Sequence, residues 1–335
     1  NYSLRREEVK NLLSFLKFKL AFMKKIKLLI GFFVLILSTS TVFAQQDPQY
    51  TQYMYNMNVV NPAYAGSKET LSGGLLYRQQ WAGLEGAPKT ATLALHSPIG
   101  KNVGLGISAI SDKIGPIEEN NFYADFSYKL NLGGNHRLSF GLKAGATFQK
   151  VGLFSEIGNG FIQQAGDISF RQDANNTFLN IGTGIFYHTN KYYAAFSVPN
   201  MLDQNYLDIT NNGQVYQFGS TKQHYFFTGG YVFDLSSNTK FKPSFMMKSA
   251  FNAPISFDFS ANFLFFEKFE IGGTYRLDDS MGAMINYAIT PSIRLGYAYD
   301  HVLSDLKVTT TASHEFMLLF DLNFSKKVSV SPRFF

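Results

Sequence analysis

Residues 121–130 read NFYADFSYKL, and apolar and polar side chains alternate along this stretch. Successive side chains of a β-strand point to opposite faces, so this order predicts a strand with one apolar and one largely polar face. The apolar set contains three aromatic rings, which must be covered by something other than water. It comprises Phe122, Ala124, Phe126, Tyr128 and Leu130, opposite Tyr123, Asp125, Ser127 and Lys129.

The same alternation recurs from residue 71 onward, most clearly at 103–112, 137–149, 256–266 and 314–324. We predict about fourteen strands of roughly eight to thirteen residues, close to the ~9–11 residues that a tilted strand needs to cross a bilayer. Their expected starts are Leu71, Lys89, Val103, Asn121, Arg137, Thr177, Lys191, His224, Lys240, Ser256, Lys268, Met281, Ser292 and His314.

The strands of a water-soluble sandwich also alternate between apolar and polar side chains. The lengths of the connections between strands are therefore needed to distinguish a soluble sandwich from a membrane barrel. The even-numbered connections are short, whereas the first, third, fifth, seventh and thirteenth are longer and the ninth and eleventh are intermediate. Short turns at one end and long loops at the other are typical of an outer-membrane barrel, with the short turns in the periplasm. The two longest loops, 150–176 and 199–223, are then extracellular.

In hydrocarbon every backbone polar group has to pair internally, so a membrane sheet must close on itself. The sequence therefore predicts an all-β fold. We expect residues 71–335 to form a transmembrane barrel of about 14 antiparallel strands, surrounded by the lipid of a bacterial outer membrane.

Residues 23–44 have the three parts of a secretory signal peptide. Met23 is followed by three lysines within four residues, by an apolar run at 28–37, and by Val42-Phe43-Ala44 with small residues at the cleavage positions. The apolar run is about half of the ~20 residues that a membrane-spanning helix needs, so we expect cleavage after Ala44. We expect residues 1–22 to be an upstream extension outside the fold.

Charge and composition remove several classes of function. Residues 1–44 hold eight of the 30 Lys and Arg and two of the 24 Asp and Glu, which leaves 22 of each sign in the remainder. A neutral mature chain lacks the positive surface of a phosphate-backbone binder, so no nucleic-acid partner is expected. With zero cysteines the chain has no disulfide, thiolate metal ligand or thiol nucleophile.

Motifs for catalysis or cofactor binding are weak. The string Gly104-Leu105-Gly106-Ile107-Ser108-Ala109 resembles a dinucleotide fingerprint, but it lies inside an alternating strand, and its glycines are expected to face a crowded lumen. The six histidines include no i, i+4 pair, and no G-x-S-x-G elbow accompanies Ser313-His314-Glu315. Acidic pairs at 118–119 and 278–279 are expected in loops. We expect no catalytic residue, no cofactor and no metal.

Two arginines are expected to have a structural role. Arg276 and Arg294 occupy polar-face positions and should point into the lumen, where they would pair with acids such as Asp300 or Glu270. A sharper alternative is that they constrict a pore.

The segment 45–70 differs from the rest because it neither alternates nor is of low complexity. Its first 23 residues read QQDPQYTQYMYNMNVVNPAYAGS, with turn chemistry at Asn61-Pro62 and Ala65-Gly66 and closely spaced tyrosines. Two interpretations stay open. The segment is either a flexible periplasmic leader, or an ordered plug in the lumen or periplasmic docking element.

Several stretches, in order along the mature chain, resemble the PorP/SprF family of the type IX secretion and gliding systems. They are 47–54, 61–66, 78–81, 86–90, 272–276, 297–300 and 313–315. The resemblance implies an outer-membrane barrel without enzyme activity that associates with type IX secretion components and helps export or anchor secreted surface proteins such as adhesins. The matched positions form a candidate docking or structural core: Tyr50, Tyr53, Asn61, Pro62, Tyr64, Trp81 and Pro88.

Three functions remain in competition. The first is a non-enzymatic attachment component whose long loops hold an exported partner. The second is an outer-membrane channel for small solutes or apolar ligands, since fourteen strands can enclose a cavity. The third, an outer-membrane lipase or protease, rests only on scattered serines, histidines and aspartates.

Overall fold

The computed structural model describes residues 49–152, 174–211, 214–221, 223–250, 254–304, 307, 310 and 312–322. The expected upstream extension, the signal peptide and residues 45–48 lie outside this set, as does the chain after Leu322. Within the described part, no helix is long and apolar enough to cross a membrane.

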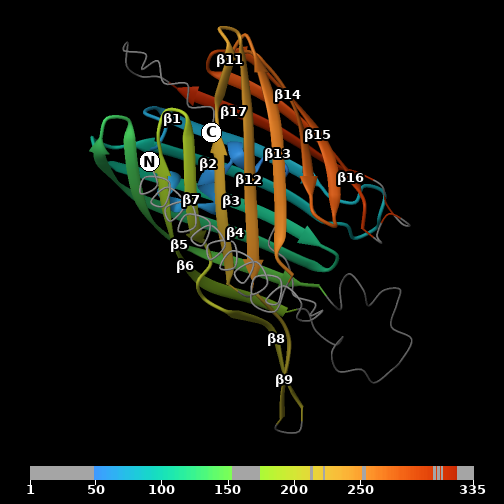
Figure 1. The fold of residues 1–335 in the computed structure, drawn as a ribbon. Helices are drawn as coiled ribbons and strands as arrows, with labels where there is room; N and C mark the ends of the chain where they lie inside the picture. The colour runs from blue at the N-terminus through green and yellow to red at the C-terminus, as the bar shows by residue number, and fades with distance from the viewer. Residues whose placement is uncertain are drawn as a thin grey trace, which may run out of the picture. The chain divides into compact units, whose positions relative to one another are not determined.

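The described strands form one closed antiparallel barrel (Figure 1). Neighbours in the sheet follow chain order, β1 pairs with β17, and β10 pairs with β12, which closes the ring. β10 and β11 lie end to end beside β12, so fifteen strands occupy fourteen positions. The bounds are β1 Leu71–Gln79, β2 Lys89–Pro98, β3 Val103–Ile114, β4 Ile117–Gly133, β5 His136–Val151, β6 Ala174–His188, β7 Tyr192–Val198, β10 His224–Tyr231, β11 Phe233–Ser236, β12 Thr239–Ala250, β13 Ser256–Phe265, β14 Phe269–Arg276, β15 Ser280–Thr290, β16 Ile293–Val302 and β17 Ala312–Leu322.

Side chains alternate between an apolar outer wall and a polar lumen, as the sequence predicts. On β4, Phe122 and Phe126 are exposed on the outside, whereas Asp125 and Ser127 are each 2% exposed and face inward. The outer wall needs an apolar solvent, because its large exposed side chains come from nearly every strand. Examples are Leu75, Leu105, Phe140, Ile185, Phe227, Phe259, Ile271, Ile285, Leu295 and Phe316.

Short turns gather at one end of the barrel, at residues 99–102, 134–135, 189–191, 237–238, 266–268 and 291–292. The described connections at the opposite end include 80–88, 115–116 and the described part of 199–223. Most of the expected loop 150–176, residues 153–173, lies outside the described residues. The connection 199–223 carries a feature that the sequence did not reveal, a separate two-stranded sheet of β8 Gln204–Asn211 and β9 Gln214–Thr221 (Figure 1). We call it the loop hairpin.

One expectation about the connections was wrong. The third connection was expected to be long and to hold Glu118 and Glu119, but β3 and β4 continue until only residues 115–116 join them, and both acids lie on β4. Opposite charges explain the extension, because Lys113 is directly across from Glu118 in the register. The second acidic pair, Asp278-Asp279, does lie in a turn.

Residues 49–68 pack inside the barrel, and we call them the plug. The plug contains three short helices: η1 Tyr53–Tyr55, α2 Met57–Val60 and η2 Pro62–Tyr64. Asn61 caps η2, since its side-chain oxygen accepts the Ala63 amide at 2.9 Å and Pro62 stands at the first helical position. Such short helices have little stability alone, so contacts with the wall must hold them.

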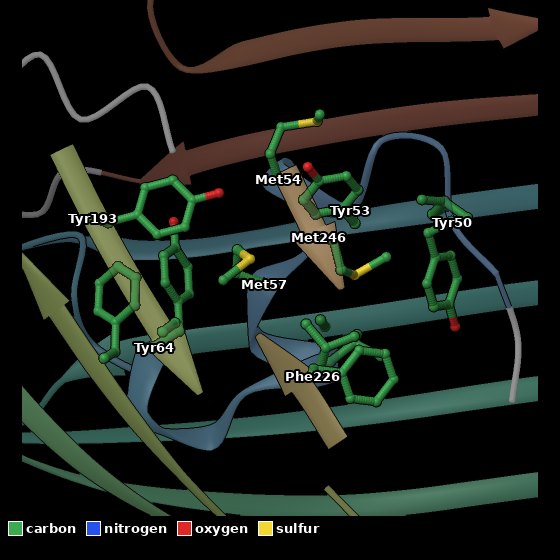
Figure 2. Packing of buried hydrophobic residues seen from close by; sticks show 14 of the residues in the cluster. Tyr50, Tyr53, Met54, Met57, Tyr64, Tyr193, Phe226 and Met246 are labelled. Atoms are coloured by element: carbon green, nitrogen blue, oxygen red, sulfur yellow. The ribbon is translucent and has the colours of Figure 1, made fainter. Parts of the chain in front are cut away.

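The plug forms the centre of the buried apolar cluster. Figure 2 shows Tyr53, Met57 and Tyr64 from the plug beside Tyr193 and Met246 from the wall. Tyr64 packs edge-on against Phe186, with ring centroids 5.2 Å apart. The hydrophobic core of this barrel is therefore formed by the plug together with the inward-facing side chains of the wall that surround it.

Candidate functional site

Lumen-facing glycines make room for the plug backbone. A β-carbon at Gly141 would overlap Ala63, one at Gly104 would overlap the Ala65 carbonyl, and one at Gly184 would overlap the Asn61 side chain. Gly106 lies against Asn58 in the same way. The prediction that Gly104 and Gly106 face a crowded lumen is thus confirmed, and what crowds it is the plug.

A buried ion cluster holds the first residues of the plug. Glu315 accepts the main-chain amides of Thr51 and Gln52, each at 2.8 Å. Arg78 lies 2.9 Å from Asp300 and 3.2 Å from Glu315, and it also donates to the Thr51 hydroxyl at 2.7 Å. All five residues are buried, so each charge depends on these partners.

A second cluster holds Tyr55. Its hydroxyl donates to Glu270, and Lys242 donates to the same hydroxyl at 2.9 Å. Lys242 and Arg294 lie 3.1 and 3.6 Å from Glu270, which is fully buried. The predicted pairing of Arg294 with Glu270 is confirmed.

Arg276 also pairs with acids, as expected, but with other acids than the two named as examples. Arg276 contacts Asp258 at 2.7 Å and Asp279 at 3.1 Å, and no direct ion pair joins it to Asp300. The register explains this, because Asp258 is directly across from Arg276 between β13 and β14. Asp300 is instead occupied by Arg78 and Thr51.

Further polar contacts tie the plug to the other half of the wall. Asn58 donates to Asp125 at 3.1 Å, and Asp125 also pairs with Lys143 at 2.7 Å. Ser197 donates to the Val60 carbonyl at 2.7 Å. Plug contacts therefore come from strands all around the ring, which fixes the segment without any strand pairing.

The plug has a defined direction. Its first residues meet Arg78, the penultimate residue of β1 at the long-loop end. Its last residues meet the short-turn end, where Gly66 donates to His96 at 3.2 Å and Lys68 lies 3.5 Å from Asp321. The chain therefore runs through the lumen from the long-loop end and then turns back into β1.

The structure brings together five of the seven residues in the candidate docking or structural core. Tyr50, Tyr53, Asn61, Pro62 and Tyr64 all lie buried in the plug. Trp81 and Pro88 do not join them, since both lie in the loop after β1. There the Trp81 amide donates to Ser313 at 3.0 Å, and the Pro88 carbonyl accepts the Gln80 amide at 3.0 Å.

Sequence reasoning missed the wall residues that hold the plug: Arg78, Asp125, Lys143, Lys242 and Glu315. The available signal was a charged residue at an inward position of an otherwise alternating strand. The described residues contain no group of three His, Asp or Glu side chains able to hold a metal ion.

A closed barrel of fourteen strand positions, with an apolar outer wall and a polar interior, defines the class of outer-membrane β-barrel proteins. Residues 42–320 match the family model described as type IX secretion system membrane protein PorP/SprF, and the chain belongs to this family. The family indicated by the sequence motifs is confirmed, and the protein is located in the bacterial outer membrane. A comparison with curated proteins finds no match.

Similar solved structures include three outer-membrane proteins at low identity. The monoaromatic hydrocarbon channel CymD is 11% identical, with 84% of this chain and 95% of that chain covered and a TM-score of 0.46. The Acinetobacter baumannii outer membrane protein Omp33 is 10% identical, with coverages of 75% and 96% and a TM-score of 0.43. A Pseudomonas aeruginosa FadL homologue is 12% identical, with coverages of 83% and 95% and a TM-score of 0.42.

Proposed function

We propose that this type IX secretion membrane protein is a non-enzymatic anchor that helps export or retain secreted surface proteins such as adhesins. In this proposal the long-loop end holds the exported partner outside the cell, and the short-turn end meets other type IX components in the periplasm. The observation that carries the proposal is the plug, because a barrel filled by its own chain offers a rigid platform instead of a passage.

Two features of the lumen support an anchor over a channel. Two cavities beside the plug, both bounded by described residues, hold only about 60 Å³ and about 10 Å³. Both clusters of buried charge are occupied by plug groups, since Glu315 binds plug amides and Glu270 binds Tyr55. Charges that line a conducting pore would instead face water and ions.

The loop hairpin supports a binding role at the opposite end from the short turns. Its two strands pair only with each other among the described residues, so each has one unpaired edge. Unpaired strand edges are templates for the addition of a partner strand. We infer that this hairpin contributes to the grip on the exported partner.

We further propose that residues 23–44 are a signal peptide that directs the chain to the envelope and is then cleaved off. N-terminal sequencing of the protein purified from outer membranes tests this point. A first residue of Gln45 is the expected result, and a chain that keeps residues 23–44 would contradict it.

The test of the anchoring role is affinity purification of a tagged protein from detergent-solubilised outer membranes, followed by mass spectrometry. We expect a large secreted surface protein and type IX subunits to co-purify. A variant with residues 204–221 replaced by a Gly-Ser linker should lose the secreted protein and keep the subunits. Recovery of the barrel alone from wild-type cells would refute the proposal.

A channel for small solutes or apolar ligands is the second candidate. One observation favours the channel: individual hydrogen bonds and ion pairs hold the plug in the lumen, and the plug does not pair with the wall as a strand. Such a plug can be displaced without breaking the barrel sheet. Single-channel recording in planar bilayers separates the two functions. We expect the wild-type barrel to be nearly silent and a variant lacking residues 49–68 to conduct, whereas stable wild-type conductance would favour the channel.

A further inference from the structure

A small pocket remains in the lumen at the long-loop end, above the plug. Its volume is about 60 Å³. Its floor is formed by plug residues and its walls by β3–β6, β10 and residues 199–200 after β7, and we call it the vestibule pocket. The side chains used below are Val59, Asn121, Thr147, Asn180, Asn200 and Phe226.

The polar wall of the vestibule pocket is a connected network. The side-chain oxygen of Asn121 accepts hydrogen bonds from Thr147 at 2.5 Å and Tyr123 at 3.2 Å. The side-chain oxygen of Asn200 accepts from the Asn180 amide at 2.6 Å. Both oxygens are therefore taken, and the Nδ2 groups of Asn121 and Asn200 have no partner among the described residues.

Asn180 adds an unsatisfied acceptor to the same network. The side chain is only 3% exposed, and its Oδ1 has no hydrogen-bond partner within the described part of the chain. A buried polar atom of this kind costs roughly 1–3 kcal/mol unless something bonds to it. The pocket thus presents two unused donors, which suit the carbonyl oxygens of a peptide. The Asn180 Oδ1 is itself fully buried and does not open into the pocket.

The rest of the lining is mixed, because it also includes Tyr50, Tyr123 and the charged side chains of Glu119 and Lys143. Both charges have partners on the wall, since Lys143 pairs with Asp125 and Glu119 accepts from Gln149. Val59 contributes an aliphatic surface from the plug and Phe226 a ring from β10. These groups suit a methyl or isopropyl group rather than a charged one.

The mouth of the vestibule pocket lies at the base of the loop hairpin. Asn200 is followed by Met201, whose amide donates to the Ile181 carbonyl at 2.8 Å and whose carbonyl accepts from Gln223 at 2.7 Å. These bonds fix the loop at both roots of the hairpin. A chain that adds to the hairpin edge would therefore continue over the pocket.

We propose that the vestibule pocket binds an extended peptide segment of the exported partner and takes one small side chain of the size of Ala, Ser, Thr or Val. In this arrangement Asn121 and Asn200 donate to the peptide carbonyls, and the small side chain contacts Val59 and Phe226. The proposal rests on the anchoring role, to which it adds the chemistry that the partner must present.

Size favours a peptide over a sugar. The pocket has less than half of the ~150 Å³ that accommodates a benzene ring in a protein core. A pyranose ring is larger than benzene, and so are the side chains of Phe and Trp, so neither enters without displacing the plug.

The cellular test fills the pocket. Asn200→Trp should reduce the co-purified secreted protein at least tenfold, whereas Leu142→Trp, on the outer wall where the side chain is 63% exposed, should leave it unchanged. Heat-modifiable migration in gels checks that both barrels are folded. If Asn200→Trp retains the partner at the wild-type level, the pocket proposal is wrong.

A second test uses purified full-length barrel and capped pentapeptides Gly-Gly-X-Gly-Gly, measured by isothermal titration. Peptides with X as Ala, Ser, Thr or Val should bind at least tenfold more tightly than those with Phe or Trp, and Asn200→Trp should abolish the difference. No binding, no dependence on X, or binding of a neutral oligosaccharide instead would each overturn the proposal. Peptide binding by a barrel that recovers no partner from cells would uphold the pocket and refute the anchoring role.

Discussion

The carboxylate of Glu315 accepts the main-chain amide of Gln52 at 2.8 Å, across 263 residues of sequence. The second oxygen of the same carboxylate accepts the Thr51 amide and faces Arg78. Glu315 is fully buried, so its charge is balanced by two plug amides and one guanidinium. This residue therefore couples closure of the barrel, through β17, to retention of the plug.

Removing the Glu315 charge should loosen the plug. Glu315→Gln leaves Arg78 with Asp300 alone and weakens the bonds to both plug amides. We expect a loss of about 3–5 kcal/mol in the free energy of unfolding, the usual cost of breaking a buried ion pair. Urea unfolding of the refolded barrel, followed by the fluorescence of the single Trp, measures it. A cost below 1 kcal/mol would mean that the cluster does not hold the plug.

Glu267→Gln is the matched control for this change. Glu267 also pairs with a cation, Lys240 at 3.2 Å, but its side chain is 67% exposed. An exposed pair contributes about 0–1 kcal/mol, so the urea midpoint should hardly move.

The close approach of the plug to the wall predicts a sharp glycine requirement. Gly141→Ala forces a methyl group into the Ala63 backbone and should cost about 1–3 kcal/mol, as overpacking of a core does. Gly273→Ala is the control, because Gly273 faces outward and the atom nearest to an added β-carbon is 3.8 Å away. Equal urea midpoints for the two variants would contradict the close packing described here.

The barrel could be predicted from the sequence because its signals are local. Alternation at residues 121–130 sets the two faces of β4, and the turns between strands are marked by short polar stretches. The expected starts Leu71, Lys89, Val103, His224 and Ser256 agree with the structure, and the other nine differ from it by one to four residues. The largest difference is at β4, where residues 117–120, which include Glu118 and Glu119, extend the strand by pairing with β3.

The plug contacts could not be predicted, because they depend on which inward residues lie at the same height in the closed ring. Arg78, Asp300 and Glu315 come from three strands that the register places side by side, β1, β16 and β17. No sequence spacing encodes that height. Trp81 shares a motif with Arg78 but lies beyond the end of β1, which is why the two residues separate.

The sidedness of the barrel can be measured directly because the chain has no cysteine. Glu85 lies in the loop between β1 and β2 at the long-loop end, and Ser292 lies in the turn between β15 and β16 at the short-turn end; both are exposed. Long loops of outer-membrane barrels face the outside of the cell. A membrane-impermeant maleimide should therefore label Glu85→Cys in intact cells, and Ser292→Cys only after the outer membrane is permeabilised.

Because the plug begins at the long-loop end, the same orientation places Gln49 near the cell surface, and Gln49→Cys should be labelled under the same conditions as Glu85→Cys. Labelling of Ser292→Cys in intact cells would reverse the orientation and move the loop hairpin and the vestibule pocket to the periplasm.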